Sequence, residues 1–146
     1  IANTIMNAHC LRGNEGIMIT TGIKGSCSIL ADESTSAKTM GSGTLDVFAT
    51  PAMAALMEKT AWQSIAPYLQ EGQGSVGTRL DITHDAATPL GMTVMCSSEL
   101  IQIDGRRLVF EVTAKDDKEI IGKGIHERFI IDNDKFLTKT AAKHTT

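Results

Sequence analysis

The chain has 146 residues, a length typical of one domain with a substantial core. Its formal net charge is −3, and only 4% of its residues are aromatic. A nearly neutral chain without a basic run is not expected to bind nucleic acid by charge, and few aromatic residues are available to stack on bases. No apolar run approaches the roughly 20 residues of a membrane-spanning helix. We therefore expect no nucleic acid and no membrane as a partner.

The cysteines Cys10, Cys27 and Cys96 are odd in number and lack CxxC spacing, which excludes a closed disulfide framework and a cysteine-based zinc site. We expect reduced thiols in a cytoplasmic protein and no bound metal. The first residues lack the charged and then apolar pattern of a signal peptide. We interpret residues 1–17 as a flexible or borrowed leader, residues 18–138 as one domain, and residues 139–146 as a C-terminal tail.

The first half of the domain predicts strands and then a helix. Residues 18–38 suit one or two edge strands, with a turn near Lys24 and Gly25, and a glycine-containing loop follows that matches no phosphate-binding motif. Thr50 and Pro51 mark a helix start, because Thr is a good N-cap and Pro is favoured in the first turn. Residues 52–66 then predict a helix that is apolar on most sides and therefore buried. Its apolar side chains recur every four residues at Met53, Met57, Ala61 and Ile65.

Four strands follow at residues 76–86, 92–103, 106–115 and 119–131, joined by short turns. Asp104 and Gly105 predict a two-residue hairpin turn. The order of a strand, one buried helix and four antiparallel strands predicts an α+β fold whose sheet wraps around the helix and leaves an edge for a second copy. On the first of the four strands, alternation predicts that one face is turned toward the helix. That face carries Val76, Thr78, Leu80, Ile82, His84 and Ala86.

Three polar residues lie where apolar ones are expected. Glu58, in the middle of the helix, needs a partner or a water-lined cleft, unless it shares an exposed face with Lys59 and Gln63. His84 suits either a satisfied core histidine or a proton carrier. Thr50 suits either a simple N-cap or a place at a helix N-terminus whose free N–H groups stabilise an oxyanion.

The last strand carries two further candidates, His126 and Arg128, on the same face as Gly122 and Gly124. Glycines in a strand allow close approach of a backbone or a ligand. His126 and Arg128 suit either contact with a phosphate-bearing ligand or a salt-bridged surface strand.

One distance limits how the candidates combine. Thr50 and Glu58 are eight residues apart, or about 12 Å along a helix, so their side chains cannot touch within it. A reaction centre that uses both needs a bridging group such as His84 or a water, or it is built from two chains related by a two-fold axis.

Five blocks stand in order with short gaps: residues 43–58 (GTLDVFATPAMAALME), 74–78 (GSVGT), 83–89 (THDAATP), 104–108 (DGRRL) and 124–128 (GIHER). Together they resemble the hotdog-fold acyl-CoA thioesterases of the fluoroacetyl-CoA thioesterase-like group, and the resemblance covers about residues 18–136. It implies a hotdog fold, an antiparallel sheet around one long central helix. It also implies a homodimer with active sites at the subunit interface, with further association left open.

The resemblance further implies the site residues. The catalytic Thr, Glu and His of the family fall on Thr50, Glu58 and His84, a glycine near the bound thioester falls on Gly77, and an arginine falls on Arg128. CoA is part of the substrate, and no separate cofactor is implied. The fluoroacetyl-specific enzyme has a phenylalanine gate shortly before its threonine, whereas residues 43–46 contain no aromatic residue. This difference favours a general thioesterase for a short or modest acyl group.

We therefore predict hydrolysis of an acyl-CoA to the free acid and CoA. Glu58 attacks the carbonyl or activates a water, and the sequence leaves both routes open. His84 moves protons, Thr50 orients the substrate or His84, and the helix amides and the Gly77 N–H are candidate oxyanion donors. The alternative is a non-catalytic acyl-CoA-binding protein of the same fold. A hydratase or dehydratase of this fold, which pairs Asp with His, fits less well.

Overall fold

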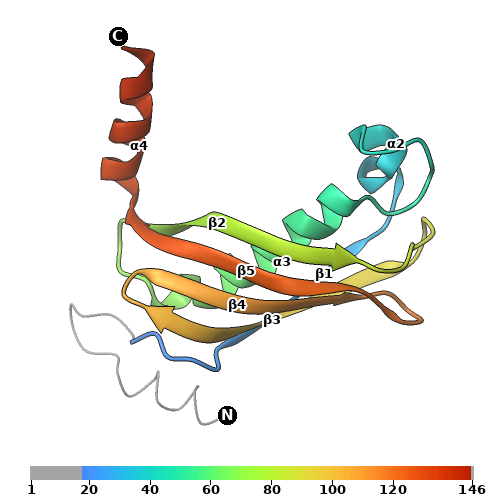
Figure 1. Ribbon diagram of the computed structural model, residues 1–146, viewed down its shortest axis with the longest axis horizontal. Coiled ribbons are helices and arrows are strands. Elements are labelled where there is room, and N and C mark those ends of the chain that lie inside the picture. Colours follow the sequence, from blue (N-terminus) through green and yellow to red (C-terminus); the bar gives the residue numbers. More distant parts are fainter. Residues whose placement is uncertain (1–17, 146) are drawn as a thin grey trace.

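The computed structural model describes residues 18–145 and has an α+β architecture, as predicted. A five-stranded antiparallel sheet curls around one long helix, α3 (Figure 1). The main elements are β1 (Lys24–Leu30), α3 (Thr50–Ile65), β2 (Gln73–His84), β3 (Thr93–Asp104), β4 (Arg107–Lys115) and β5 (Ile120–Asp132). The strand order is β1-β3-β4-β5-β2, so β1 and β2 form the two edges of the sheet.

Helix α3 forms the centre of the core. The predicted stripe of Met53, Met57, Ala61 and Ile65 is fully buried, because the curled sheet covers this face. From β4, the alternating side chains of Leu108, Phe110, Val112 and Ala114 are fully buried as well. These two apolar faces belong to one hydrophobic core, and burial of such side chains is the main favourable term in folding.

The face of α3 that carries Ala54, Glu58 and Trp62 is only partly covered. Ala54 and Glu58 are half-buried, and the Trp62 side chain is 42% exposed. Glu58 therefore does not belong to a solvated face shared with Lys59, nor to the buried stripe. It lies at the margin of the core, beside the edge strand β2.

Two glycines let the sheet approach α3 closely. A Cβ on Gly122 of β5 would lie 2.6 Å from the Sδ of Met53, and a Cβ on Gly25 of β1 would lie 2.8 Å from the carbonyl oxygen of Thr60. Neither position therefore has room for a side chain. Gly25 lies inside β1, so the turn predicted near it was wrong. The turn is at Thr21 and Gly22, where Gly22 has a φ of 96° that favours glycine.

Strand β2 contains a β-bulge that the alternation did not predict. Gly77 pairs with Arg128 and Arg79 pairs with Glu127, so Thr78 is the extra residue. The bulge reverses the phase of alternation, which places Gly77 on the helix-facing side together with Leu80, and Val76 on the outer side. The prediction that Val76 shares the inner face was therefore wrong.

The hairpin turn between β3 and β4 is displaced by one residue from its predicted position. Asp104 pairs with Arg107, so the two loop residues are Gly105 and Arg106, and Gly105 has a φ of 62°. Type I′ and II′ turns need a positive φ at the first loop position, which explains why the glycine occupies it.

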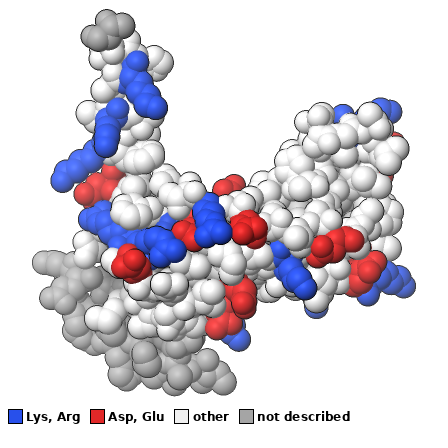
Figure 2. Space-filling model, viewed as in Figure 1, with Lys and Arg blue, Asp and Glu red and all other residues white. Residues whose placement is uncertain are grey.

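Beyond β5 the chain forms a helix, α4 (Asn133–Ala141), that the sequence analysis did not assign. It projects away from the sheet near the start of β2 (Figure 1). In the space-filling view, Lys and Arg gather along α4, whereas both signs of charge are mixed over the sheet below it (Figure 2). The predicted leader and Cys10 lie outside the described residues. Within these residues no helix is long and apolar enough to cross a membrane, and Cys27 and Cys96 are free thiols.

A buried carboxylate fixes two loops at the open end of the sheet. Asp116, in the turn between β4 and β5, accepts hydrogen bonds from the Thr88 hydroxyl at 2.8 Å and from the backbone N–H groups of Lys118 and Glu119 at 2.8 and 3.0 Å. These bonds hold the pKa of the Asp116 carboxyl below its ordinary value, although burial acts in the opposite direction. Thr88 follows the strand end that carries His84, so Asp116 steadies the loop after that residue.

We expect Asp116→Ala to lower the free energy of unfolding by about 1–3 kcal/mol, because three donors lose their acceptor. Urea unfolding followed by circular dichroism measures this loss. Asp117→Ala removes a neighbouring exposed carboxylate and serves as the control, with an expected change within about 0.5 kcal/mol. Equal effects of the two substitutions would contradict a structural role for Asp116.

Candidate active site

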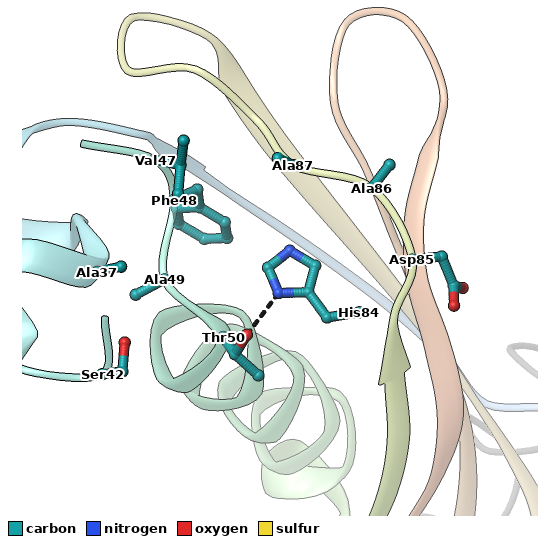
Figure 3. A pocket seen from close by; sticks show the side chains of 10 residues that line it. All are labelled: Ala37, Ser42, Val47, Phe48, Ala49, Thr50, His84, Asp85, Ala86 and Ala87. Carbon is teal, nitrogen blue, oxygen red and sulfur yellow. Dashed lines mark hydrogen bonds between the residues drawn. The ribbon is translucent and has the colours of Figure 1, made fainter. Parts of the chain in front are cut away.

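Thr50 and His84 form a direct hydrogen-bonded pair at the start of α3. The Thr50 Oγ1 lies 2.6 Å from the Nδ1 of His84, which is the last residue of β2 (Figure 3). The N-cap of α3 is Ala49, so the reading of Thr50 as an N-cap was wrong. Thr50 is the first residue of the helix, and its hydroxyl bonds to His84 instead of capping the backbone.

His84 is set up as a neutral imidazole. Burial lowers its pKa below the usual value, while the charge of Asp85 and the backbone at Ala86 partly oppose this effect. We assign the Thr50 hydroxyl as donor to Nδ1, which leaves the ring proton on Nε2. Nε2 is buried and has no hydrogen-bond partner among the described residues. Within the described part of one chain, this N–H group therefore has a hydrogen bond that it does not make.

A cavity of about 260 Å³ lies against this pair. Small side chains dominate its walls, which the close-up view shows arranged around the imidazole of His84 (Figure 3). The lining residues are Ala37, Ser42, Val47, Phe48, Ala49, Thr50, His84, Asp85, Ala86 and Ala87. The small side chains leave room for a ligand group beside the imidazole.

A second cluster surrounds Glu58, farther along α3. A Cβ placed on Gly77 would lie 2.8 Å from the Glu58 Oε2, 3.2 Å from the His126 Cε1 and 3.4 Å from the Arg128 Nη1. The carboxylate, the imidazole and the guanidinium thus converge on Gly77, a position of β2 that has no side chain. Glu58 has, in Arg128, the charged partner that its place in an apolar helix required.

Arg128 and His126 are buried, at 7% and 0% exposure, so the hypothesis of a salt-bridged surface strand was wrong for them. The ion pairs lie on the opposite face of the sheet, where Glu127 binds Arg79 at 3.2 Å and Arg107 at 2.9 Å. Burial lowers the pKa of Arg128, and the negative charge of Glu58 opposes this effect. Glu58 is therefore the counter-charge of a buried guanidinium.

The chain thus holds two separate groups of candidate residues. Thr50 lies with His84, and Glu58 lies with Gly77, His126 and Arg128. Glu58 forms no hydrogen bond with Thr50 or His84, as the spacing of about 12 Å along the helix predicted. Among the described residues, no cluster of three or more His, Cys, Asp or Glu side chains is suited to hold a metal.

Sequence analysis missed one member of the second group, Ser75. Its hydroxyl accepts a hydrogen bond from the Arg128 Nε at 2.8 Å, and its carbonyl accepts one from Nη2 at 2.9 Å. Ser75 lies in the resembling block 74–78, but nothing in its own residue type marks a contact with an arginine 53 positions away.

Comparisons with known proteins identify the family of the chain. The profile of the FlK family, fluoroacetyl-CoA-specific thioesterase, matches residues 31–134. The chain belongs to the FlK family. A fluoroacetyl-CoA thioesterase from Streptantibioticus cattleyicolor is 47% identical to this FlK family member over 98 residues, which are 67% of this chain and 70% of that protein. A structure of FlK itself is 35% identical with a TM-score of 0.82, over 88% of this chain and 98% of that one.

A thioesterase superfamily member from Thermus thermophilus has a TM-score of 0.81 at 23% identity, over 87% of this chain and 94% of that one, and this similarity shows the shared fold. Another similar structure is a hot-dog-like protein from Thermanaerovibrio acidaminovorans. The predicted family, the hotdog fold and the activity of an acyl-CoA thioester hydrolase are therefore confirmed for this FlK family member.

We expect Gly77→Ala to impair turnover of an acyl-CoA by the FlK family member, because the added methyl group would lie 2.8 Å from the Glu58 Oε2 and displace the carboxylate. The expected loss of kcat is about tenfold or more, since we expect Glu58 to be a reacting group and small displacements of such groups are costly. Steady-state kinetics measures it. The control is Gln73→Ala at the start of β2, for which we expect little change in kcat. Gly72→Ala is not suitable, because Gly72 has a φ of 84° and any side chain there strains the backbone.

Proposed function

We propose that this FlK family member hydrolyses acyl-CoA thioesters with short acyl groups, of about the size of acetyl. The observation that carries the proposal is the Thr50 and His84 pair, hydrogen-bonded at 2.6 Å against a cavity of about 260 Å³ with small side chains in its walls. Structures of FlK variants contain fluoroacetate, acetyl-CoA, or fluoroacetate with CoA. Residues 43–46 lack an aromatic side chain, which supports a general short-acyl preference over a fluoroacetyl-specific one.

The two groups of residues meet if two copies of the chain pair along β2. This strand is a free edge, and beside it the α3 face of Glu58 and Trp62 is only partly covered. A two-fold axis near Leu80 and Asp81 would extend the sheet and bring Gly77 of one copy opposite His84 of the other. Each of the two equivalent sites then takes Glu58 from one chain and Thr50 with His84 from the other.

In this site the carboxylate, imidazole and hydroxyl divide the chemistry. Glu58 removes a proton from a water that attacks the thioester carbonyl, or it attacks the carbonyl carbon itself, and both routes stay open. As the C–S bond breaks, the proton on the His84 Nε2 passes to the leaving sulfur. The Thr50 hydroxyl holds the Nδ1 side of the ring. The Gly77 N–H and the free N–H groups at the start of α3 are the candidate donors to the oxyanion.

Arg128 suits a role beside Glu58 better than direct contact with CoA phosphates. Its guanidinium is almost fully buried and already donates to Ser75 and toward His126. The buried cation is the counter-charge of the carboxylate and helps to hold it beside Gly77. We assign the contact with the reacting thioester to Gly77, whose position lies open beside the Glu58 carboxylate.

Release of CoA thiol from a panel of acyl-CoA substrates tests the proposed function, with acetyl-CoA and propionyl-CoA expected to turn over faster than long-chain esters. In Glu58→Gln, kcat is expected to fall by a hundredfold or more with the dimer intact, because the amide can neither attack nor accept the proton. Lys59→Gln, an exposed change on the same helix, is the control. Binding of CoA without turnover of any ester by the unaltered chain would favour a non-catalytic binding protein, and full activity of Glu58→Gln would remove Glu58 from the chemistry.

For His84→Ala we expect a kcat lower by about a hundredfold, because the imidazole donates a proton. The thermal midpoint is expected to change little, because the half-buried imidazole fills little of the core. Differential scanning fluorimetry beside the kinetic assay separates the two effects. A variant that loses its fold in parallel with its activity would support a core histidine without a catalytic role.

A further inference from the structure

His126 is fully buried and has a defined hydrogen-bond partner on each ring nitrogen. Its Nδ1 lies 2.8 Å from the backbone carbonyl oxygen of Arg79, which can only accept, so Nδ1 carries the proton. Its Nε2 lies 3.1 Å from the Nη1 of Arg128, which can only donate, so Nε2 accepts. The two contacts together require the neutral Nδ1–H form of the ring.

The ring links the β-bulge to the guanidinium. The Arg79 carbonyl belongs to the residue directly after the bulge at Thr78, and the aromatic ring of Phe110 stacks on the imidazole at 6.3 Å between centroids. The position of His126 is thus fixed from β2 and β4 at once. Its Nε2 in turn holds Nη1, which lies within 3.4 Å of the point on Gly77 toward which the Glu58 carboxylate is directed.

We propose that His126 is a positioning residue for the hydrolysis, which acts by holding the Arg128 Nη1 in register with the Glu58 carboxylate. Ser75 accepts from Nε and Nη2, so His126 supplies the acceptor for the third guanidinium nitrogen. Without that acceptor, the nitrogen closest to Gly77 is left buried without a hydrogen-bond partner and turns toward Glu58, which withdraws the carboxylate from the substrate. The inference rests on the proposed function and goes beyond it, because His126 then contacts no substrate.

The charge state of His126 matters to the same contact. Glu58 acts on the ring from α3, Arg128 from β5, and the Arg79 carbonyl from β2, while Glu127 on the outer face of β5 acts only through its charge. Burial lowers the pKa of His126 below its usual value, and the positive charge of Arg128 lowers it further. The carboxylates of Glu58 and Glu127 raise the pKa and partly oppose these effects. The ring is therefore neutral at pH 7, and a proton added at lower pH would occupy Nε2, the atom that accepts from Arg128.

Two amide substitutions test the contacts of the two ring nitrogens, Nδ1 and Nε2, separately. In His126→Gln the amide oxygen reaches the place of Nε2 and can still accept from Arg128, whereas in His126→Asn the shorter side chain can serve only the Arg79 carbonyl. We expect His126→Asn to lose kcat on acetyl-CoA by about tenfold or more with KM within twofold, and His126→Gln to stay within about threefold of the unaltered enzyme.

The pH dependence gives a readout that a purely structural role would not change. The ratio of kcat for the unaltered enzyme to kcat for His126→Gln is expected to fall as the pH drops below 6.5, because only the imidazole loses its acceptor by protonation. Titration of His84 affects both enzymes and cancels in the ratio. Glu127→Gln, on the outer face of the same strand, is the control, with an expected loss of thermal stability but unchanged kcat.

Equal kcat for His126→Asn and His126→Gln, or a ratio that does not depend on pH, would overturn the inference. Should His126→Asn fail to fold, His126→Phe keeps the packing against Phe110 without the acceptor, and the same expectations apply to it. Failure of the proposed function gives a different result, since the unaltered chain would then release no thiol from any acyl-CoA.

Discussion

The positive charge of Arg128 is buried between the sheet and the central helix, and a buried guanidinium is costly unless its donors and its charge are all matched. Ser75, His126 and Glu58 together meet this requirement, from β2, β5 and α3. The arrangement fixes the position of Glu58, which would otherwise be an ionisable group in an apolar helix. The strands and the helix that carry these residues must therefore keep their mutual register for the carboxylate to remain in place.

The pair of Thr50 and His84 has a different physical basis. Thr50 and His84 meet because the first residue of α3 and the last residue of β2 are brought to the same end of the sheet, beside a loop held by Asp116. Within one chain, the pitch of α3 separates this pair from Glu58. A helix of fixed rise per residue cannot bring positions 50 and 58 to one atom, so the proposed function needs a second copy of the chain to unite them.

Periodicity predicted the core well and the edge strand less well. The stripe from Met53 to Ile65 and the alternation along β4 are properties of single elements, and each was read from spacing alone. The bulge at Thr78 depends on the partner strand β5, so Val76 was placed on the wrong face. Helix-capping preferences also predicted Thr50 as the N-cap, but its hydroxyl forms a tertiary hydrogen bond with His84 instead.

The candidate residues could be predicted from polar residue types at unexpected positions and from the resemblance. The contacts between these residues could not be predicted in this way. That His126 and Arg128 are buried rather than solvated follows from the curl of the sheet over α3, which no single strand reveals. Ser75 has no signal in the sequence because its role depends on a strand pairing across more than fifty residues.

The extra residue at position 78 also decides which side chains of β2 face the helix. If Thr78 instead paired with Arg128 in an uninterrupted ladder, every residue before it would move by one pairing partner and turn to the other surface of the sheet. Thr78 would then stand where Gly77 leaves space, and Val76 would take the place of Ser75 on the inner face. An irregular strand is thus the condition under which a carboxylate, an arginine and a bare backbone position share one side.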